Sequence, residues 1–227
     1  ANTSGTENAA SGWNTLAANT TGNYNVAFGG AALAANTTAD NNTGLGFKSL
    51  NANTTGADNT AVGFKALTAN TTASENVAVG KGALDAATTA AGNTAVGTDA
   101  LGAVTTQSYN TAVGYNAMLV ATSASGCSAF GNQALDANTT GDYNTAVGSG
   151  ALGANTTAST NTGVGYAALA ANTTGAGNTA VGKDALAVNT TAGNNVAVGW
   201  LAMTSNSTGA ANVAVGRSAL GANTTAS

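Results

Sequence analysis

Hydrophobic and polar residues recur along this chain with a fixed period of 17 residues, and no insertion or deletion interrupts the period from Asn8 onward. The consensus unit is N-T/V-A-V-G-x-x-A-L-x-A-N-T-T-G/A-x-x. The fifth position is Gly in all 13 units, and the ninth is Leu in eleven and Met in two. The units start at Asn8, Asn25, Asn42, Asn59, Asn76, Asn93, Asn110, Cys127, Asn144, Asn161, Asn178, Asn195 and Asn212. We therefore expect a single repeat domain over residues 1–227, with a partial unit at 1–7.

The length of the unit predicts the fold. A unit of 17 residues is too short for two packed helices, because helical-hairpin repeats need more than about 30 residues. A parallel β-coil can be this short, and it places each residue about 4.8 Å from its equivalent in the next coil. One inserted residue would turn the following side chains to the wrong face, which explains the strict length. The sequence predicts an all-β fold, a parallel β-solenoid (β-roll) of about 13 coils with uncapped ends.

The alternation of side chains predicts two strands in each coil. Positions two and four should point to one face and position three to the other. The fifth-position Gly should adopt a positive φ at a turn. A second strand should then carry the ninth and eleventh positions inward. In the unit that starts at Asn59, the predicted core residues are Val62, Leu67 and Ala69.

The third and eighth positions, Ala61 and Ala66 in the same unit, should then lie on the opposite, outer face. A solvated face normally varies and carries charge, whereas these positions are nearly always Ala. Either alanine is simply tolerated there, or the small side chains let a second surface approach closely. Close approach by a second copy would bury the apolar area that such a thin coil lacks.

The A-N-T-T segment creates a rank of N-x-S/T sequons. Two interpretations stand: N-glycosylation, or a ladder of stacked side-chain amides and hydroxyls. The ladder is favoured, because sites about 4.8 Å apart leave no room for a glycan on every coil. Three consecutive units lose this Asn, with Ala87, Val104 and Ala121 in its place. The sequons in the rank are Asn2, Asn19, Asn36, Asn53, Asn70, Asn138, Asn155, Asn172, Asn189, Asn206 and Asn223, with Asn41 outside the register.

Aromatic and basic residues gather at variable positions that should be exposed turns. All five basic residues fall at positions six and seven: Lys48, Lys65, Lys81, Lys183 and Arg217. Three tyrosines, Tyr24, Tyr109 and Tyr143, occupy position seventeen. The turn aromatics at position six could instead form a stripe that binds a sugar or a receptor. They are Trp13, Phe47, Phe64, Tyr115, Tyr166 and Trp200.

Composition narrows the function. Only 6% of the residues are charged, and the formal net charge of −4 is diffuse. This argues against nucleic-acid binding, and no apolar run approaches the ~20 residues of a transmembrane helix. The chain has no His and no nucleophile, paired-carboxylate or phosphate-loop motif, so we expect no enzyme. No position holds a regular acid, so we expect no metal site and no cofactor. Cys127 should be a small core residue, although pairing between chains is an alternative.

The first half of the unit carries a family resemblance. The segments Asn76–Leu84, Asn195–Met203 and Asn212–Leu220 read N-V-A-V-G-x-x-A-L/M. They resemble the head repeats of YadA-like trimeric autotransporter adhesins, and the N-T-A-V-G-Y-x-A-L arrays of bacterial and phage tail-fibre proteins. The resemblance implies a parallel β-roll, commonly homotrimeric, exposed on a cell or virion surface and used for attachment. It also implies that valines such as Val62, Val79 and Val96 fill the roll.

Together these features predict a structural segment of an extracellular fibre or filament that serves adhesion. Expected partners are copies of the same chain, as a homotrimer or filament, and a cell-surface or glycan ligand. The alternative is a glycan- or receptor-binding module that uses the turn aromatics. Ice binding is a distant third, because the two adjacent Thr of A-N-T-T face opposite ways in an extended strand. The chain lacks an initial Met and opens within A-N-T-S, so we expect a processed product or a segment of a longer rod.

Overall fold

The computed structural model describes residues 2–225, and every regular element in that range is a short β-strand. Each strand has three residues and comes at the same place in its 17-residue unit. The strands are β1 (Ala9–Ser11), β2 (Val26–Phe28), β3 (Thr43–Leu45), β4 (Thr60–Val62), β5 (Val77–Val79), β6 (Thr94–Val96), β7 (Thr111–Val113), β8 (Ser128–Phe130), β9 (Thr145–Val147), β10 (Thr162–Val164), β11 (Thr179–Val181), β12 (Val196–Val198) and β13 (Val213–Val215).

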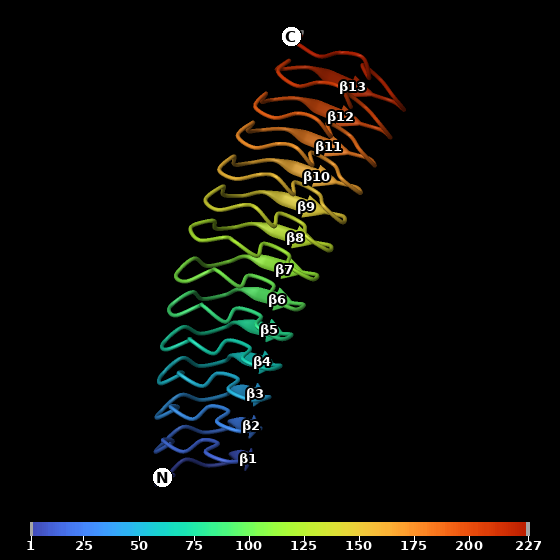
Figure 1. The fold of residues 1–227 in the computed structure, drawn as a ribbon. Helices are drawn as coiled ribbons and strands as arrows, with labels where there is room; N and C mark the ends of the chain where they lie inside the picture. The colour runs from blue at the N-terminus through green and yellow to red at the C-terminus, as the bar shows by residue number, and fades with distance from the viewer. Residues whose placement is uncertain (1, 226–227) are drawn as a thin grey trace. The chain divides into compact units, whose positions relative to one another are not determined.

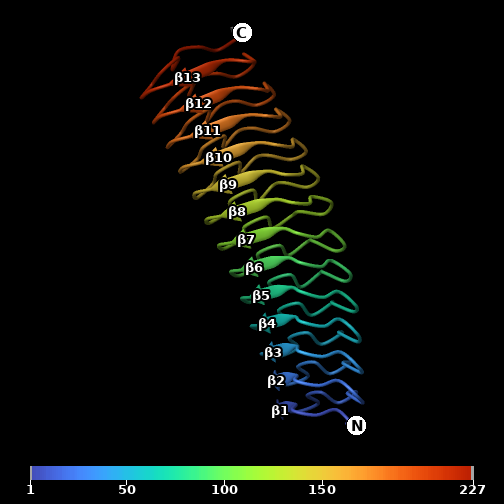
Figure 2. The same ribbon diagram turned by 180° about the vertical axis from the view of Figure 1, so that it is seen from behind.

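The coils stack in parallel and in chain order within two compact units, Ala1–Asn110 and Thr111–Ser227. In the first unit β1 to β6 pair successively, and in the second unit β7 to β13 do so (Figure 1). Each residue pairs with its own equivalent in the next coil, as Thr43 does with Thr60. From behind, Figure 2 shows the chain returning between successive strands through irregular turns. The prediction of a parallel β-solenoid with a 17-residue coil is confirmed.

The core contains the alanines that we expected outside it. In the coil of β4, Ala61, Ala66 and Leu67 are fully buried. Val62 and Ala69, two of the three predicted core residues, are only half-buried. In β2 to β13 the middle residue of the strand is therefore buried and points inward, while the first and last point outward. The predicted faces of the strand were wrong, and so was the expectation that Val62, Val79 and Val96 fill the roll.

The reason is the narrow interior of the coil. At Gly44, an inward position, an added Cβ would lie 3.4 Å from Cδ1 of Leu33 and 3.1 Å from Oγ of Ser49. A methyl group fits this space only tightly, with a small shift of Ser49, and a valine would overpack it. The ninth-position Leu fills the interior, and the alanines complete it. The two alanine ranks are thus buried within their own coil, so the hypothesis that they form an interface was also wrong.

The predicted second strand does not form; the described structure has turns there. The ninth-position residue has a positive φ in every unit, 52° at Leu67 for example, and so does the seventh, with 57° at Lys65. Position seventeen has a positive φ in every unit that contains it, with 64° at Glu75. This left-handed conformation costs roughly 1–2 kcal/mol for a non-glycine residue. Hydrogen bonds along the stack offset the cost: the amide of Leu67 donates to the carbonyl of Ala83 at 2.9 Å, and that of Lys65 to Phe47 at 2.9 Å.

Candidate functional site: the asparagine ladders and the turn aromatics

Two buried asparagines close each regular coil around one inward carbonyl. In the coil of β4, Nδ2 of Asn59 and Nδ2 of Asn70 both donate to the carbonyl of Ala73, at 2.9 and 3.0 Å. All three residues are buried. A buried polar group without a partner costs about 1–3 kcal/mol. The hydrogen bonds from the two side-chain amides to the one carbonyl avoid this cost. We call this arrangement the asparagine clamp; it fixes the N-T-T turn against the start of the same coil.

The same side chains also join successive coils. Within the first unit, Nδ2 of Asn53 donates to Oδ1 of Asn36 at 3.0 Å, and Nδ2 of Asn70 donates to Oδ1 of Asn53 at 2.7 Å. The first-position rank joins coils differently: the backbone amide of Asn76 donates to Oδ1 of Asn59 at 3.1 Å. Each asparagine therefore bonds both within its coil and along the stack.

This geometry bears on N-glycosylation. A buried side-chain amide that already donates two hydrogen bonds is out of reach of a modifying enzyme unless the coil opens. Asn2 and Asn41 are exposed and Asn223 is half-buried, so these three differ from the rest of the rank. The buried sequon asparagines are Asn19, Asn36, Asn53, Asn70, Asn138, Asn155, Asn172, Asn189 and Asn206.

The twelfth-position ladder of the first unit ends at Asn70. The next coil has Ala87 at the equivalent position, fully buried and with no amide to donate. As a result, Oδ1 of Asn70 is buried without a hydrogen-bond partner among the described residues. The sequence showed the loss of Asn at this place, and the structure adds its physical consequence.

The threonines of N-T-T have two different environments. Oγ1 of Thr54, at position thirteen, donates to the carbonyl of Thr71 in the next coil at 2.9 Å. Thr55, its neighbour at position fourteen, is exposed.

The inward carbonyl of position fifteen, on which the asparagine clamp depends, was not predicted from the sequence. Its signal was the near-exclusive Gly or Ala at that position, with Gln107 as an exception.

Cys127 replaces the first-position Asn and takes over its bonds. Its Sγ lies 3.3 Å from the carbonyl oxygen of Gly141, and the amide of Asn144 donates to Sγ at 3.4 Å. The side chain is buried. It therefore behaves as a member of the ladder, in which the thiol is a weaker donor and acceptor than an amide.

Burial should make the stability of this coil depend on alkaline pH. Burial raises the pKa of the Cys127 thiol from its ordinary value of 9.0 to about 11. The unfolded chain ionises first as the pH rises, so stability is full below pH 9 and is lost progressively toward pH 11. At roughly 1.4 kcal/mol per unit of pKa, the loss should reach about 3 kcal/mol.

Urea unfolding of the wild type and of Cys127→Asn between pH 8 and pH 11.5 measures this difference. The variant restores the repeat residue, so it should lack the part of the decline that depends on Cys127 and share any part that does not. Equal pH dependence in the two proteins would contradict the assignment, as would a thiol that labels as fast in the folded protein as in urea.

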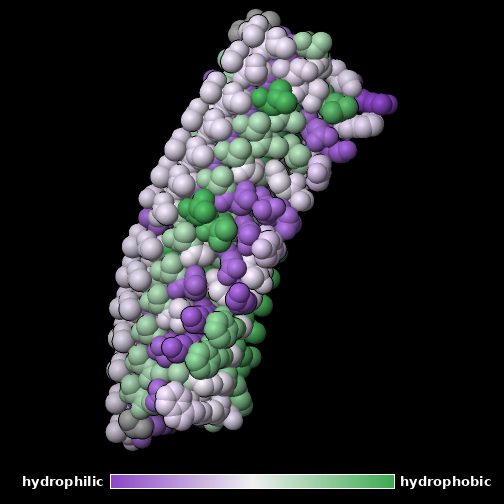
Figure 3. Space-filling view, viewed as in Figure 1, coloured by the Kyte–Doolittle hydropathy of each residue, from purple (hydrophilic) through white to green (hydrophobic). Residues whose placement is uncertain are grey.

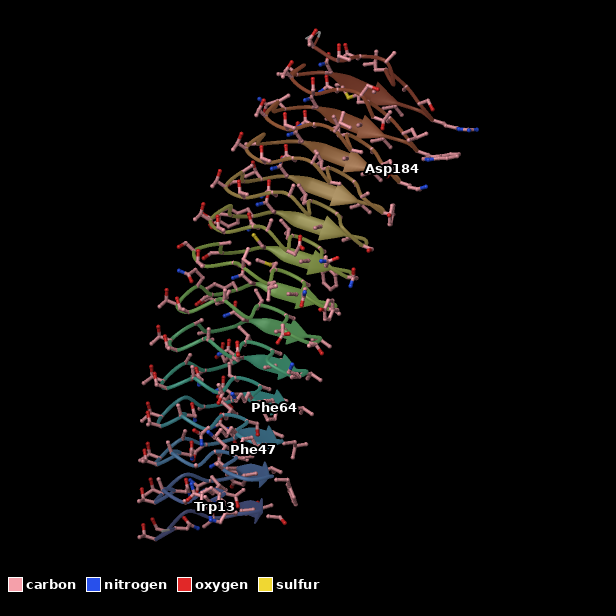
Figure 4. The ribbon with its side chains drawn as sticks, viewed as in Figure 1. Trp13, Phe47, Phe64 and Asp184 are labelled. Carbon is pink, nitrogen blue, oxygen red and sulfur yellow. The ribbon has the colours of Figure 1, made fainter. Side chains whose placement is uncertain are left out.

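The turn aromatics are exposed, and each follows its strand after a single Gly. Figure 4 labels three of them, Trp13, Phe47 and Phe64. Phe47 and Phe64 stack across adjacent coils, with ring centroids 5.7 Å apart and an interplanar angle of 17°. Cations lie over four of the rings: Lys48 over Phe47 at 5.5 Å, Lys65 over Phe64 at 5.4 Å, Lys183 over Tyr166 at 5.8 Å and Arg217 over Trp200 at 4.4 Å. Such ring faces can stack on the apolar face of a sugar or on another cation.

Over residues 2–225 the structure has no group of three or more His, Cys, Asp and Glu placed to hold a metal ion, and no pocket. In the same range no helix has the length and apolar character needed to cross a membrane.

Comparison of the chain with protein-family models, with curated proteins and with solved structures finds no match. The resemblance to adhesin head and tail-fibre repeats therefore stays a prediction from the repeat motif alone.

Proposed function

We propose that this chain is a structural segment of an extracellular fibre or filament that serves attachment to a surface. The observation that carries the proposal is the direction of its hydrogen bonds. Backbone amides of the strand, of the left-handed turns and of the two threonines of N-T-T donate to a neighbouring coil rather than within their own coil, as Val77 does to Asn93 at 2.9 Å and Thr71 to Thr88 at 3.0 Å.

The asparagine ladders add to this axial cohesion. Each regular coil contributes one Nδ2-to-Oδ1 bond at position twelve and one amide-to-Oδ1 bond at position one, for instance Asn172 to Asn155 at 2.9 Å and Asn178 to Asn161 at 2.9 Å. At about 1 kcal/mol net for each bond, repeated in every coil, the ladders resist separation of neighbouring coils. A repeat that devotes its buried polar groups to holding coils together suits a load along the stack.

External labelling tests the proposal. An antibody against the chain, applied to intact cells or particles of its source, should decorate thread-like projections in electron micrographs. Label that appears only after the cells are permeabilised would contradict an extracellular fibre. Purified chain of the same batch, spotted on the grid, controls for recognition by the antibody.

A second candidate, a glycan- or receptor-binding module, is favoured by the exposed rings that carry a cation on one face. Trp200, with Arg217 at 4.4 Å, is the best formed of these. If the module binds a glycan, Trp200→Ala should weaken binding about two- to tenfold, because an aromatic stacking contact is worth roughly 0.5–1.5 kcal/mol.

Binding of the purified chain to an immobilised glycan panel measures this effect, and Tyr166→Ala gives a second test. Thr174→Ala, a truncation of an exposed side chain away from the rings, is the matched control. Affinity unchanged in both aromatic variants, with the circular dichroism of the wild type, would remove this candidate.

A further inference from the structure

Aromatic and basic side chains alternate at the sixth position of four successive coils in the second unit. They are Tyr166, Lys183, Trp200 and Arg217, and each directly follows a fifth-position Gly. We call these four side chains the aromatic–basic row. All four are exposed, Tyr166 and Trp200 at 59% and 44%. In Figure 3, hydrophilic side chains project from the coils of β11 to β13 beyond the ends of the strands.

Each cation of the row lies against the ring of the preceding coil. Nζ of Lys183 lies 5.8 Å from the ring centroid of Tyr166, and Cζ of Arg217 lies 4.4 Å from that of Trp200. The backbone holds the row in register, because amides of the next coil donate to the carbonyls of Tyr166, Lys183 and Trp200 at 2.9, 3.0 and 2.8 Å. The row is therefore largely organised before any ligand arrives, which lowers the ordering cost of binding.

The spacing of the row fits a linear polymer that lies along the stack. Lys183 and Arg217 are two coils apart, about 9.6 Å at 4.8 Å for each coil, and Trp200 lies in the coil between them. A polymer with one anionic group for every two coils would place each anion at a cation and its neutral part at a ring. An acidic polysaccharide with one carboxylate in each disaccharide has this pattern, because an extended disaccharide has about this length.

Charge also favours an anionic ligand. The second unit has two basic residues, and both belong to the row, although the whole chain has a formal net charge of −4. One acid lies beside them: Oδ2 of Asp184 is 3.6 Å from Nζ of Lys183. The side chain of Lys183 is still 57% exposed, so it can contact a ligand. Asp184, labelled in Figure 4, would compete with an anionic ligand for this cation.

A single-stranded nucleic acid fits the row less well. It carries one phosphate on every nucleotide, so phosphates would face the rings and Asp184 as well as the cations. Its affinity comes mainly from the number of phosphates that a protein neutralises, and the row offers two cations. A polymer that alternates charged and neutral groups suits an alternating surface better.

We propose that the aromatic–basic row binds an acidic polysaccharide that runs along the stack. Lys183 and Arg217 pair with its carboxylates, and Tyr166 and Trp200 contact the apolar faces of its sugars. The inference rests on the second candidate function, for which it names the class of glycan. It also assigns Asp184 a role, since this carboxylate limits the affinity for an anion.

Calorimetric titration with hyaluronan, which has one carboxylate in each disaccharide, tests the inference. The comparison ligand is the same polymer with its carboxylates reduced to alcohols. Lys183→Gln with Arg217→Gln should weaken binding of hyaluronan about tenfold, because two exposed ion pairs, each worth a factor of roughly two to five, are lost together. The same variant should leave binding of the reduced polymer unchanged. Affinity for hyaluronan should also fall as the salt concentration rises.

The matched control is Lys48→Gln with Lys65→Gln, which removes the same charge from the first unit. Gln already occupies the equivalent seventh position at Gln133, so the control should fold, and it should bind hyaluronan as the wild type does. Equal weakening by the control and by the variant of the row would show that overall charge, and not the row, attracts the polymer.

Asp184→Asn should act in the opposite direction. It removes the carboxylate that competes for Lys183, so affinity for hyaluronan should rise by a factor of roughly two to five. Asn already occupies the seventh position, with positive φ, at Asn14 and Asn116. A purely structural role of Asp184 predicts no such gain, and unchanged or weaker binding of this variant would contradict its assignment.

Three results would overturn the inference: equal affinity for hyaluronan and its reduced form, hyaluronan binding that survives the variant of the row, or tighter binding of single-stranded DNA than of hyaluronan. Binding of the reduced polymer that is lost in Trp200→Ala would leave the second candidate function standing while the acidic ligand fails. The external labelling experiment decides the proposed fibre independently of all these outcomes.

Discussion

Replacing Gly182 with Ala should destabilise the second unit by about 4 kcal/mol, through backbone strain and overpacking together. Gly182 has φ of +134°, a region that is open essentially to Gly alone. An added Cβ would lie 2.5 Å from the carbonyl oxygen of Gly199 and 2.6 Å from its carbonyl carbon. These are backbone atoms of the next coil, so relief would require the coils to separate. Urea unfolding followed by circular dichroism measures the loss.

Gly150→Asn provides the matched control in the same unit. Gly150 has φ of +65°, and an added Cβ there would meet nothing within 4 Å. Asn tolerates this left-handed conformation and already occupies the equivalent position at Asn14 and Asn116. The control should unfold within about 0.5 kcal/mol of the wild type. Equal stability of Gly182→Ala and the control would mean that the stack does not require close approach at the fifth position.

The solenoid could be predicted from the sequence because its evidence lies in the period. The strict 17-residue spacing and the Gly at the fifth position of every unit follow from the stacking of equivalent residues. They do not depend on the shape of the coil's cross-section. The positive φ of that Gly, 137° at Gly63, was predicted for the same reason. Both features depend on local backbone geometry and on repetition.

The cross-section could not be predicted in the same way, because period two fixes alternation but not direction. The larger Val62 was expected inside and Ala61 outside, and the reverse holds because Leu67 fills the interior. The second strand was wrong because alternation was assumed where the backbone turns at Lys65 and Leu67 with positive φ. Leu rarely adopts a left-handed backbone conformation, so its local propensity does not predict a turn at this position.

The asparagine clamp could be predicted in part. The rank at Asn53 and Asn70 was visible in the sequence, and a hydrogen-bonded ladder was the favoured interpretation. Its buried acceptor, the carbonyl of Ala73, has no side-chain signature beyond a small residue. The sequence of a repeat can thus predict polar contacts between equivalent side chains of successive coils. It does not predict hydrogen bonds from a side chain to a backbone carbonyl.

Deletion of one whole unit should leave the fold intact, whereas a deletion one residue shorter should not. Removal of Asn59–Glu75 joins Asp58 to Asn76, so every later residue keeps its equivalent below it. Removal of Asn59–Ser74 leaves Glu75 as an extra residue, and in the adjoining coils it shifts the register by one. A one-residue slip turns inward side chains outward, which would place Val77 and Val79 where Ala78 fits.

The two deletions differ by a single residue, so chain length and composition serve as their own control. The whole-unit deletion should keep the spectrum of the wild type and a melting temperature within a few degrees of it. The shorter deletion should lose at least one coil, because overpacking at 1–3 kcal/mol for each misplaced side chain exceeds what one coil contributes. Circular dichroism and limited proteolysis around residue 76 measure this. Equal protection of the two deletions would mean that coils pair without register. The buried asparagine ladders argue against that. In the shorter deletion, Asn76 would lose its contact with the equivalent Asn of the coil below.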